Sequence, residues 1–263
     1  MERRFYAIEI AYDGGRFRGF QRQPALPTVQ AAVEDSLARA GICAHIAVAA
    51  RTDAGVHALR QVVSFAVRAA LDPLALRRTL NAVLPEGVVA LAAHRVAPGF
   101  HARSSAVARR YTYLVGAPPP EPLRPYAWTL PDERAFPGAR AHLDPEALRE
   151  ALRFAVGTHD FSGLARPGAQ RGTVRTVARA DVMSAGWAPL HAIVLEGSGF
   201  LRAMVRNLVG SAVAAALGTA PTTVIRDLIL ARGRYRGVRA PGWGLTLVEV
   251  TYPPGAFRAE GSG

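Results

Sequence analysis

The sequence contains no lysine, so all 32 of its basic residues are arginine. Against 20 acidic residues they give a net charge of +12 and a pI near 11.1. Together with abundant alanine, glycine and proline, this bias indicates a GC-rich coding sequence. A strongly positive surface still attracts polyanions, and planar guanidinium groups suit phosphates. Nucleic acid is the leading partner class; an anionic membrane comes second, because no segment resembles a basic amphipathic surface helix.

Cysteine and long apolar runs are also scarce. The single cysteine, Cys43, excludes an internal disulfide or a thiolate metal site, and we predict that it is a small buried core residue. The longest weakly polar stretch, residues 208–218, is too short to span a bilayer, and no cleavage site follows the first strand. We therefore expect no signal peptide and no membrane association, and a cytoplasmic protein.

Several cofactor signatures are missing too. The sequence has neither a phosphate-binding P-loop nor a dinucleotide glycine fingerprint, and its seven histidines are scattered rather than clustered with cysteine. We accordingly expect no metal and no cofactor. A reaction that needs one nucleophile and nothing else fits this composition.

The hydrophobic pattern predicts an α+β protein of two similar halves. Half of the 263 residues are hydrophobic, enough for a full core. Each half has a helix opened by Asp-Pro, at Asp72-Pro73 and Asp144-Pro145, on a mostly antiparallel sheet. We expect domains at 1–105 and 106–253, with a disordered tail at 254–263. The expected strands are 5–12, 45–50, 61–67, 88–96, 109–115, 173–183, 190–197 and 244–252; the expected helices are 29–40, 72–87, 144–157, 200–218 and 222–232, and residues 118–137 form an irregular connection.

The stretch "ARTDAGVHALRQVV" (residues 50–63) places one carboxylate, Asp53, between two expected strands. Asp before Ala-Gly is common turn chemistry, in which Gly55 supplies a positive φ. The alternative is a catalytic carboxylate, because functional residues concentrate on loops that a rigid scaffold holds. Such a nucleophile has to be ionised and held still beside an opposite charge.

A suitable charge is present in "FLRAMVRNLVG", where Arg206 lies at the edge of an apolar helical stripe. Taken by itself, the pattern favours an arginine that snorkels from the rim of a buried helix. In "FHARSSAVARRYTYLV", the basic residues His101, Arg103, Arg109 and Arg110 precede Tyr111 and Tyr113. Basic groups beside a flat ring suit an unpaired nucleotide, although either tyrosine could equally belong to the core.

Further arginines lie in separate polar loops. Arg16, Arg18 and Arg22 follow the first strand in "YDGGRFRGFQRQP"; Arg166 opens "ARPGAQRGTVRTVAR", and another basic loop spans residues 232–244. Each could be a solvated loop. Five separated basic patches nevertheless favour an extended polyanion over a small anion.

Together these stretches resemble the tRNA pseudouridine synthases of the TruA family. The resemblance is carried by "YDGGRFRGFQRQP", "RTDAGVHA", "LNAVLP", "FHARSSAVARRYTYLV", "HDFSGL" and "FLRAMVRNLVGS", in the family's order between residues 12 and 211. It implies a pseudouridine synthase fold, with two halves joined across a basic cleft. It also implies a homodimer that needs neither metal nor cofactor and isomerises uridine in the anticodon stem-loop of tRNA, at positions 38, 39 and 40.

The resemblance also implies residue roles. Asp53 corresponds to the nucleophile, Tyr111 to the tyrosine that packs on the target base, and Arg206 to the arginine that pairs with the aspartate. Two departures are mild: Phe20 replaces the usual tryptophan, and Ala50 the usual glycine. Substrate contacts are expected from Arg51, His57, Arg103, Arg110 and Tyr111, and RNA phosphate contacts from Arg16, Arg18, Arg22 and Arg166.

Other functions remain open at this point. A non-catalytic RNA-binding protein would keep the basic surface without turnover, although it would not need a carboxylate facing a phosphate-rich ligand. A pseudouridine synthase acting on another RNA would look the same in sequence. The sequence also leaves open whether Asp53 attacks C1′ of the sugar or C6 of the base.

Overall fold

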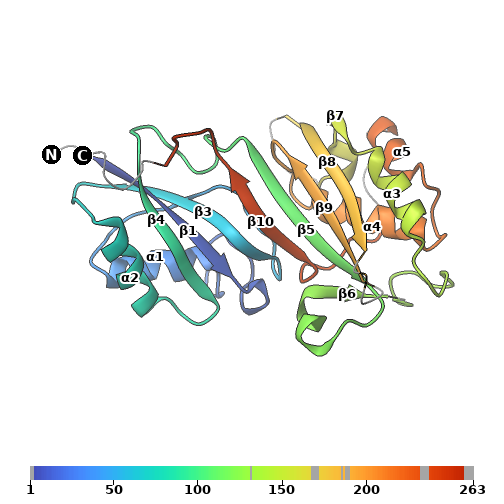
Figure 1. The fold of residues 1–263 in the computed structure, drawn as a ribbon, viewed down its shortest axis with the longest axis horizontal. Coiled ribbons are helices and arrows are strands. Elements are labelled where there is room, and N and C mark those ends of the chain that lie inside the picture. The colour runs from blue at the N-terminus through green and yellow to red at the C-terminus, as the bar shows by residue number, and fades with distance from the viewer. Residues whose placement is uncertain are drawn as a thin grey trace. The chain divides into compact units, whose positions relative to one another are not determined.

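The computed structural model describes residues 3–130, 132–166, 172–184, 186, 190–231 and 237–257. The chain divides into two units: unit 1 comprises Met1–Arg109 and Thr246–Gly263, and unit 2 comprises Arg110–Leu245 (Figure 1). Within the described part of the chain, no helix is long and apolar enough to cross a membrane.

Unit 1 is built on a sheet in the order β4-β1-β3-β10. β1 (Arg4–Tyr12) runs antiparallel to both β3 (His57–Val67) and β4 (Val88–Val96). β10 (Leu245–Thr251) runs parallel to β3, and the short β2 (Ala47–Val48) pairs with the other part of β3. The last strand, which was expected in the second half, therefore pairs with a strand of the first.

Two helices pack against this sheet, α1 (Val29–Arg39) and α2 (Pro73–Val83), and Figure 1 shows both on the same side of β1 and β4. Both begin at the predicted caps: the Thr28 hydroxyl accepts from the Ala31 N–H at 3.3 Å, and the Asp72 carboxylate from the Ala75 N–H at 2.7 Å. Cys43, just beyond α1, is exposed rather than buried as predicted, because it lies in the open segment between α1 and β2.

The other face of β1 carries a buried carboxylate. Glu9 accepts from Arg60 Nε at 3.0 Å and lies 2.9 Å from His94 Nε2. The His94 ring stacks on Phe257 at 4.5 Å, and Phe257 forms a bridge with Val96. The expected disordered tail is therefore ordered as far as residue 257, because an aromatic ring anchors it; residues 258–263 lie outside the described part.

Unit 2 contains the strands of the sheet in the order β5-β9-β8-β7. Its strands are β5 (Ala108–Gly116), whose first two residues belong to unit 1, β7 (Gly157–Asp160), β8 (Val174–Ser184) and β9 (Leu190–Gly197); β8 is antiparallel to both β7 and β9. The helices are α3 (Pro145–Arg153), α4 (Met204–Ala216) and α5 (Val224–Ala231). The predicted α+β class with mostly antiparallel sheets is confirmed.

Unit 2 also differs from expectation in three places. The strand β7 was not predicted, and the Pro-rich connection contains a 3-10 helix (Glu121–Tyr126) and β6 (Ala127–Thr129), which runs parallel to β5. The helix expected from residue 200 begins at Met204, because Ala203 has a left-handed φ of 63°.

The Glu9 cluster gives a prediction about pH. The hydrogen bond with His94, together with Arg60, lowers the pKa of Glu9 in the folded protein despite its burial. A lowered folded pKa contributes stability above the unfolded pKa, and that stability is lost as the pH falls through the folded value. We expect Glu9→Gln to reduce the loss of unfolding free energy below about pH 5, measured by urea denaturation.

The matched control is Glu86→Gln, because the Glu86 side chain is 81% exposed beside Arg16. Surface ion pairs of this kind contribute little to stability. The unfolding free energy of the Glu86→Gln protein should therefore depend on pH as that of the parent protein does. A Glu9→Gln protein that loses stability as steeply as the parent between pH 5 and 3 would contradict the role of this carboxylate.

Candidate active site

Asp53 lies on a tight turn between β2 and β3. The Val56 N–H donates to the Asp53 carbonyl at 3.2 Å, and Gly55 has a φ of +80°, as a type II turn requires. Asp53 is half-buried, while Thr52 and Val56 on either side of the turn are buried. The turn thus holds a carboxylate at the surface between two anchored residues.

Side chains from the sheet form hydrogen bonds with the residues that precede this turn. The buried Tyr12 hydroxyl lies 2.8 Å from Thr52 Oγ1, and Gln61 Nε2 donates to Tyr12 at 3.3 Å. The Gln61 amide also binds both main-chain groups of Ala50, at 2.7 Å to the carbonyl and 3.3 Å from the N–H. Burial raises the pKa of Tyr12 to about 12, so this phenol remains neutral.

The loop after β1 packs against the same turn. A Cβ on Gly14 would lie 2.0 Å from the Val56 carbonyl oxygen, so only glycine fits. The Gly14 N–H donates to His57 Nδ1 at 3.0 Å. His57 was predicted to contact substrate; it is 5% exposed, and this bond makes it join the two loops.

Gly19 and Phe20 complete the packing around the turn. Gly19 has a φ of +99°, and a Cβ there would crowd the Thr52 carbonyl and the Ala54 nitrogen at 3.2 and 3.3 Å. The Phe20 N–H donates to the Thr52 carbonyl at 3.0 Å, and its ring is buried beside Tyr12. Phenylalanine at this position therefore fills an apolar site next to the turn.

Arg109 is also buried within unit 1, at 7% exposure. Its guanidinium group donates to the carbonyls of Ala49, Arg103 and Ala106. The sequence had grouped Arg109 with basic residues that could contact phosphates. The geometry is instead that of an arginine that joins two segments of main chain.

In unit 2, both tyrosines of "RRYTY" are buried. Tyr111 is 7% exposed and meets Phe200 edge to face at 5.4 Å. Tyr113 donates to the Pro241 carbonyl at 3.0 Å, and a Cβ on Gly244 would lie 2.5 Å from its ring. Burial raises the pKa of Tyr113, so it is a neutral core residue.

Arg206 is held rather than free to snorkel. Its Nε donates to the Ala240 carbonyl at 2.7 Å, and the Ala240 N–H donates back to the Arg206 carbonyl at 3.1 Å. The adjacent Asn207 is fully buried; it donates to the Leu164 carbonyl at 2.7 Å and accepts from Arg239 at 3.0 Å. These bonds hold the segment 238–240 against α4 and fix the Nε atom of the Arg206 guanidinium group.

The arginines expected to contact phosphate differ in their partners. Arg16 pairs with Glu86 at 2.8 Å, and Arg22 pairs with Glu34 at 3.0 Å and Asp35 at 2.7 Å, so acidic neighbours already balance both charges. Arg18 is exposed, as are Arg51, Arg103 and Arg166, whereas Arg110 is half-buried. Of the other basic loops, residues 167–171 and 232–236 lie outside the described part.

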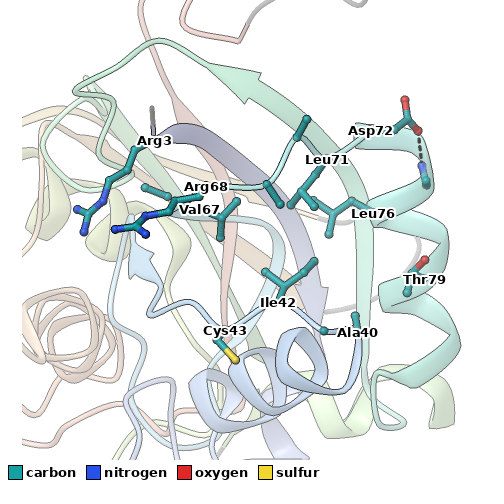
Figure 2. Close-up of a pocket in the computed structure, with 15 residues that line it drawn as sticks. Arg3, Ala40, Ile42, Cys43, Val67, Arg68, Leu71, Asp72, Leu76 and Thr79 are labelled. Carbon is teal, nitrogen blue, oxygen red and sulfur yellow. Dashed lines mark hydrogen bonds between the residues drawn. The ribbon is translucent and has the colours of Figure 1, made fainter. Parts of the chain in front are cut away.

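A cavity of about 560 Å³ lies elsewhere in unit 1 (Figure 2). Its lining includes Ile42, Leu71 and Leu76, and Figure 2 shows Arg3 and Arg68 beside one another. Arg4 pairs with Val67 at this end of β1 and β3, whereas Tyr12 pairs with Ala58 at the other. A nine-residue strand, roughly 25 Å, therefore separates the cavity from the Asp53 turn. The cavity is not the candidate active site.

The predicted residues fall in both units. Asp53, Arg51, His57 and Arg103 belong to unit 1, and Tyr111, Arg110, Arg166 and Arg206 to unit 2. Sequence reasoning missed the supporting residues Tyr12, Gln61 and Asn207, as well as the buried position of Arg109. One signal was available for Arg109: it alternates with Tyr111 and Tyr113 on β5, and all three are buried. Among the described residues, no group of three or more His, Cys, Asp or Glu could hold a metal ion.

Comparison with known proteins identifies relatives of the whole chain. The family model described as tRNA pseudouridine synthase matches residues 8–103 and 151–253. Proteins called tRNA pseudouridine synthase A are 42% identical in Neisseria gonorrhoeae, over 96% of this chain and 93% of that protein, and 38% identical in Frankia casuarinae, over 96% and 92%. The protein of that name from Methylacidiphilum infernorum is 37% identical, over 95% and 96%.

Among solved structures, a Cbf5-Nop10-Gar1 complex aligns with 96% of this chain and 50% of that chain, at 12% identity and a TM-score of 0.36, which is too low to support an argument. The family match and the identities over nearly the full length are decisive without it. The chain belongs to the tRNA pseudouridine synthase family, isomerases that act on tRNA.

Proposed function

We propose that this protein isomerises uridines 38, 39 and 40 in the anticodon stem-loop of tRNA, with Asp53 as the nucleophile. The observation that carries the proposal is the placement of the Asp53 carboxylate, half-buried on a turn between Thr52 and Val56, which are both buried and hydrogen-bonded. The relatives named tRNA pseudouridine synthase A support the choice of substrate. We also propose that the enzyme is a cytoplasmic homodimer. Its reaction uses neither metal nor cofactor.

The proposed chemistry begins with extrusion of the target base. Unstacking costs a few kcal/mol, which contacts to the base and phosphates offset. Asp53 then attacks C1′ of the sugar or C6 of the ring. The bond between N1 and C1′ breaks, the uracil rotates, and a bond forms between C5 and C1′. The covalent bond to Asp53 also breaks, which restores the free carboxylate. C5 finally loses its proton and N1 gains one, so the product is an isomer of the substrate.

Each proposed participant has a distinct task. Asp53 supplies the electron pair, which requires the ionised carboxylate in a fixed position. Tyr111 packs on the base with its ring. Arg206, whose Nε is already fixed by the Ala240 carbonyl, supplies the positive charge that favours an ionised aspartate. Arg51, Arg103 and Arg110 contact the extruded nucleotide, and exposed arginines such as Arg18 and Arg166 contact the RNA backbone.

The first prediction concerns the nucleophile. Asp53→Asn keeps the size of the side chain and removes its nucleophilic oxygen, so we expect no detectable pseudouridine while tRNA still binds. The measurement is tritium release from tRNA labelled at C5 of uridine, with binding followed by filter retention.

Asp72→Asn is the matched control. Asp72 caps α2, a role that asparagine fills equally well, and it lies away from the Asp53 turn. This variant should retain full turnover. Turnover by a purified Asp53→Asn protein would rule out the nucleophile assignment, and an equal loss in the Asp72 variant would show that the assay reports folding.

A second prediction separates catalysis from binding at Arg206. Arg206→Ala should lower the rate at saturating tRNA on the order of a hundredfold, the cost of removing one charge-stabilising donor from an active site. Its affinity for tRNA should change little. Arg153→Ala, on the exposed part of α3, serves as the control. Equal losses of rate and affinity would instead make Arg206 a phosphate contact.

A third prediction addresses the loop after β1. Arg18 is exposed and its neighbours Arg16 and Arg22 are ion-paired, so Arg18 is the residue of this loop best placed for a phosphate. Arg18→Ala should reduce the slope of log affinity against log salt by about one. Arg78→Ala, on α2, should leave the slope unchanged. A parental slope in the Arg18 variant would remove this residue from the RNA footprint.

A further inference from the structure

Arg109 is a charged side chain in an unusually buried place, with 7% of its surface exposed. Burying a guanidinium ion is costly unless hydrogen bonds replace its water. Arg109 obtains such bonds from main-chain carbonyls: Nη2 donates to Ala49 at 3.1 Å and to Arg103 at 2.5 Å, and Nη1 donates to Ala106 at 3.1 Å. This pattern belongs to a residue that organises loops.

The carbonyls that Arg109 binds come from two functional segments. Ala49 lies four residues before Asp53, at the point where the chain leaves β2. Arg103 and Ala106 lie in the turn "HARSSA", whose Arg103 side chain is exposed and expected to contact substrate. One guanidinium group therefore fixes the approach to the nucleophile and the loop that carries a substrate contact.

Other bonds fix the neighbouring positions but not the Ala49 carbonyl. Gln61 binds both main-chain groups of Ala50, and Phe20 binds the Thr52 carbonyl. The Ala49 N–H donates to Val62, so Arg109 provides the bond on its carbonyl side. Removing that bond leaves the peptide between Ala49 and Ala50 held by Gln61 on its N–H side and no longer by Arg109 on its carbonyl side. The peptide can then tilt, and a tilt there moves Asp53.

We propose that Arg109 is a positioning residue for the Asp53 nucleophile, acting through the Ala49 carbonyl and the 103–106 turn, and does not contact RNA. The proposal rests on the proposed function of Asp53. It reverses the sequence-based grouping of Arg109 with phosphate-binding residues. Lysine cannot replace it, because a single ammonium group lacks the planar fork that reaches carbonyls in different directions.

The substitution Arg109→Lys tests this proposal, because it keeps the positive charge and removes the planar guanidinium group. Since a displacement of about 1 Å can cost about a hundredfold in rate, we expect a loss of that order in the single-turnover rate at saturating tRNA. Binding affinity and its salt dependence should stay at parental values. Arg77→Lys is the matched control, because Arg77 is half-buried on α2 and donates to the Leu91 carbonyl.

A purely structural role would lower stability without changing the rate of the folded enzyme. Rates are therefore measured at a temperature where urea titration shows each variant to be fully folded. A double-mutant cycle with Gln61→Leu adds a second readout: because both residues would act on the same peptide, the combined loss in rate should be smaller than the product of the single losses. Losses that multiply would overturn the shared mechanism.

Arg109→Gln covers the case in which the lysine variant does not fold, since it retains amide donors without the charge. A positioning role predicts a reduced rate with an unchanged salt slope. A phosphate contact predicts a slope lower by about one with an unchanged rate at saturation, and that result would overturn the proposal. If Asp53→Asn retains turnover, the proposed function fails; if only the Arg109 variants keep full rate, this inference alone fails.

Discussion

The candidate site depends on one constraint: the carboxylate proposed to react lies at the surface, and only buried groups can hold it still. Solvent-exposed contacts cannot supply this rigidity, because water competes for each of them. In unit 1 the main-chain carbonyls of Ala49, Ala50 and Thr52 accept hydrogen bonds from three buried residues. These residues are Arg109, Gln61 and Phe20, respectively. The turn at Asp53 is in effect the exposed end of a buried hydrogen-bond network.

Close contacts between main-chain segments also hold the site rigid, at positions where even a Cβ atom would not fit. Gly14 packs against the Val56 carbonyl, and Gly210 of α4 packs against the Val238 carbonyl, where a Cβ would lie 1.8 Å from the oxygen. Gly14 packs against the turn that carries Asp53, and Gly210 lies on the helix that carries Arg206. The volume of one methyl group at either position would displace a whole loop, which makes these glycines structural requirements of the site.

Local signals in the sequence were sufficient for much of the fold. The hydrophobic pattern predicted β1, β8 and β9, and the Asp-Pro pairs predicted the starts of α2 and α3. Long-range packing was not visible: nothing in "LTLVEVT" indicates that β10 pairs with β3, and a four-residue strand such as β7 carries too few residues for a periodic signal. The αL residue Ala203 overrode the helical pattern before Met204, because a single backbone conformation ended it.

Motif similarity selected Asp53, Tyr111 and Arg206 as candidates where periodicity left each of them ambiguous. It could not distinguish arginines that face solvent from those that organise the interior, because a guanidinium group serves both purposes. Arg22 and Arg109 illustrate the difference: one is held by two carboxylates at the surface, the other by main-chain carbonyls in the core. Charge counting treats the two as equal, and only their neighbours separate them.

The position of β10 has a consequence for the order of events during synthesis. Its residues Thr246 and Leu247 pair with His57 and Ala58, directly after the Asp53 turn. The edge of β3 therefore stays open on the ribosome while some 180 further residues are made, including all of unit 2. A nascent chain can form the pairs of β1 with β3 and β4 early. The strand that follows the Asp53 turn gains β10 as a neighbour only after all of unit 2 has been made.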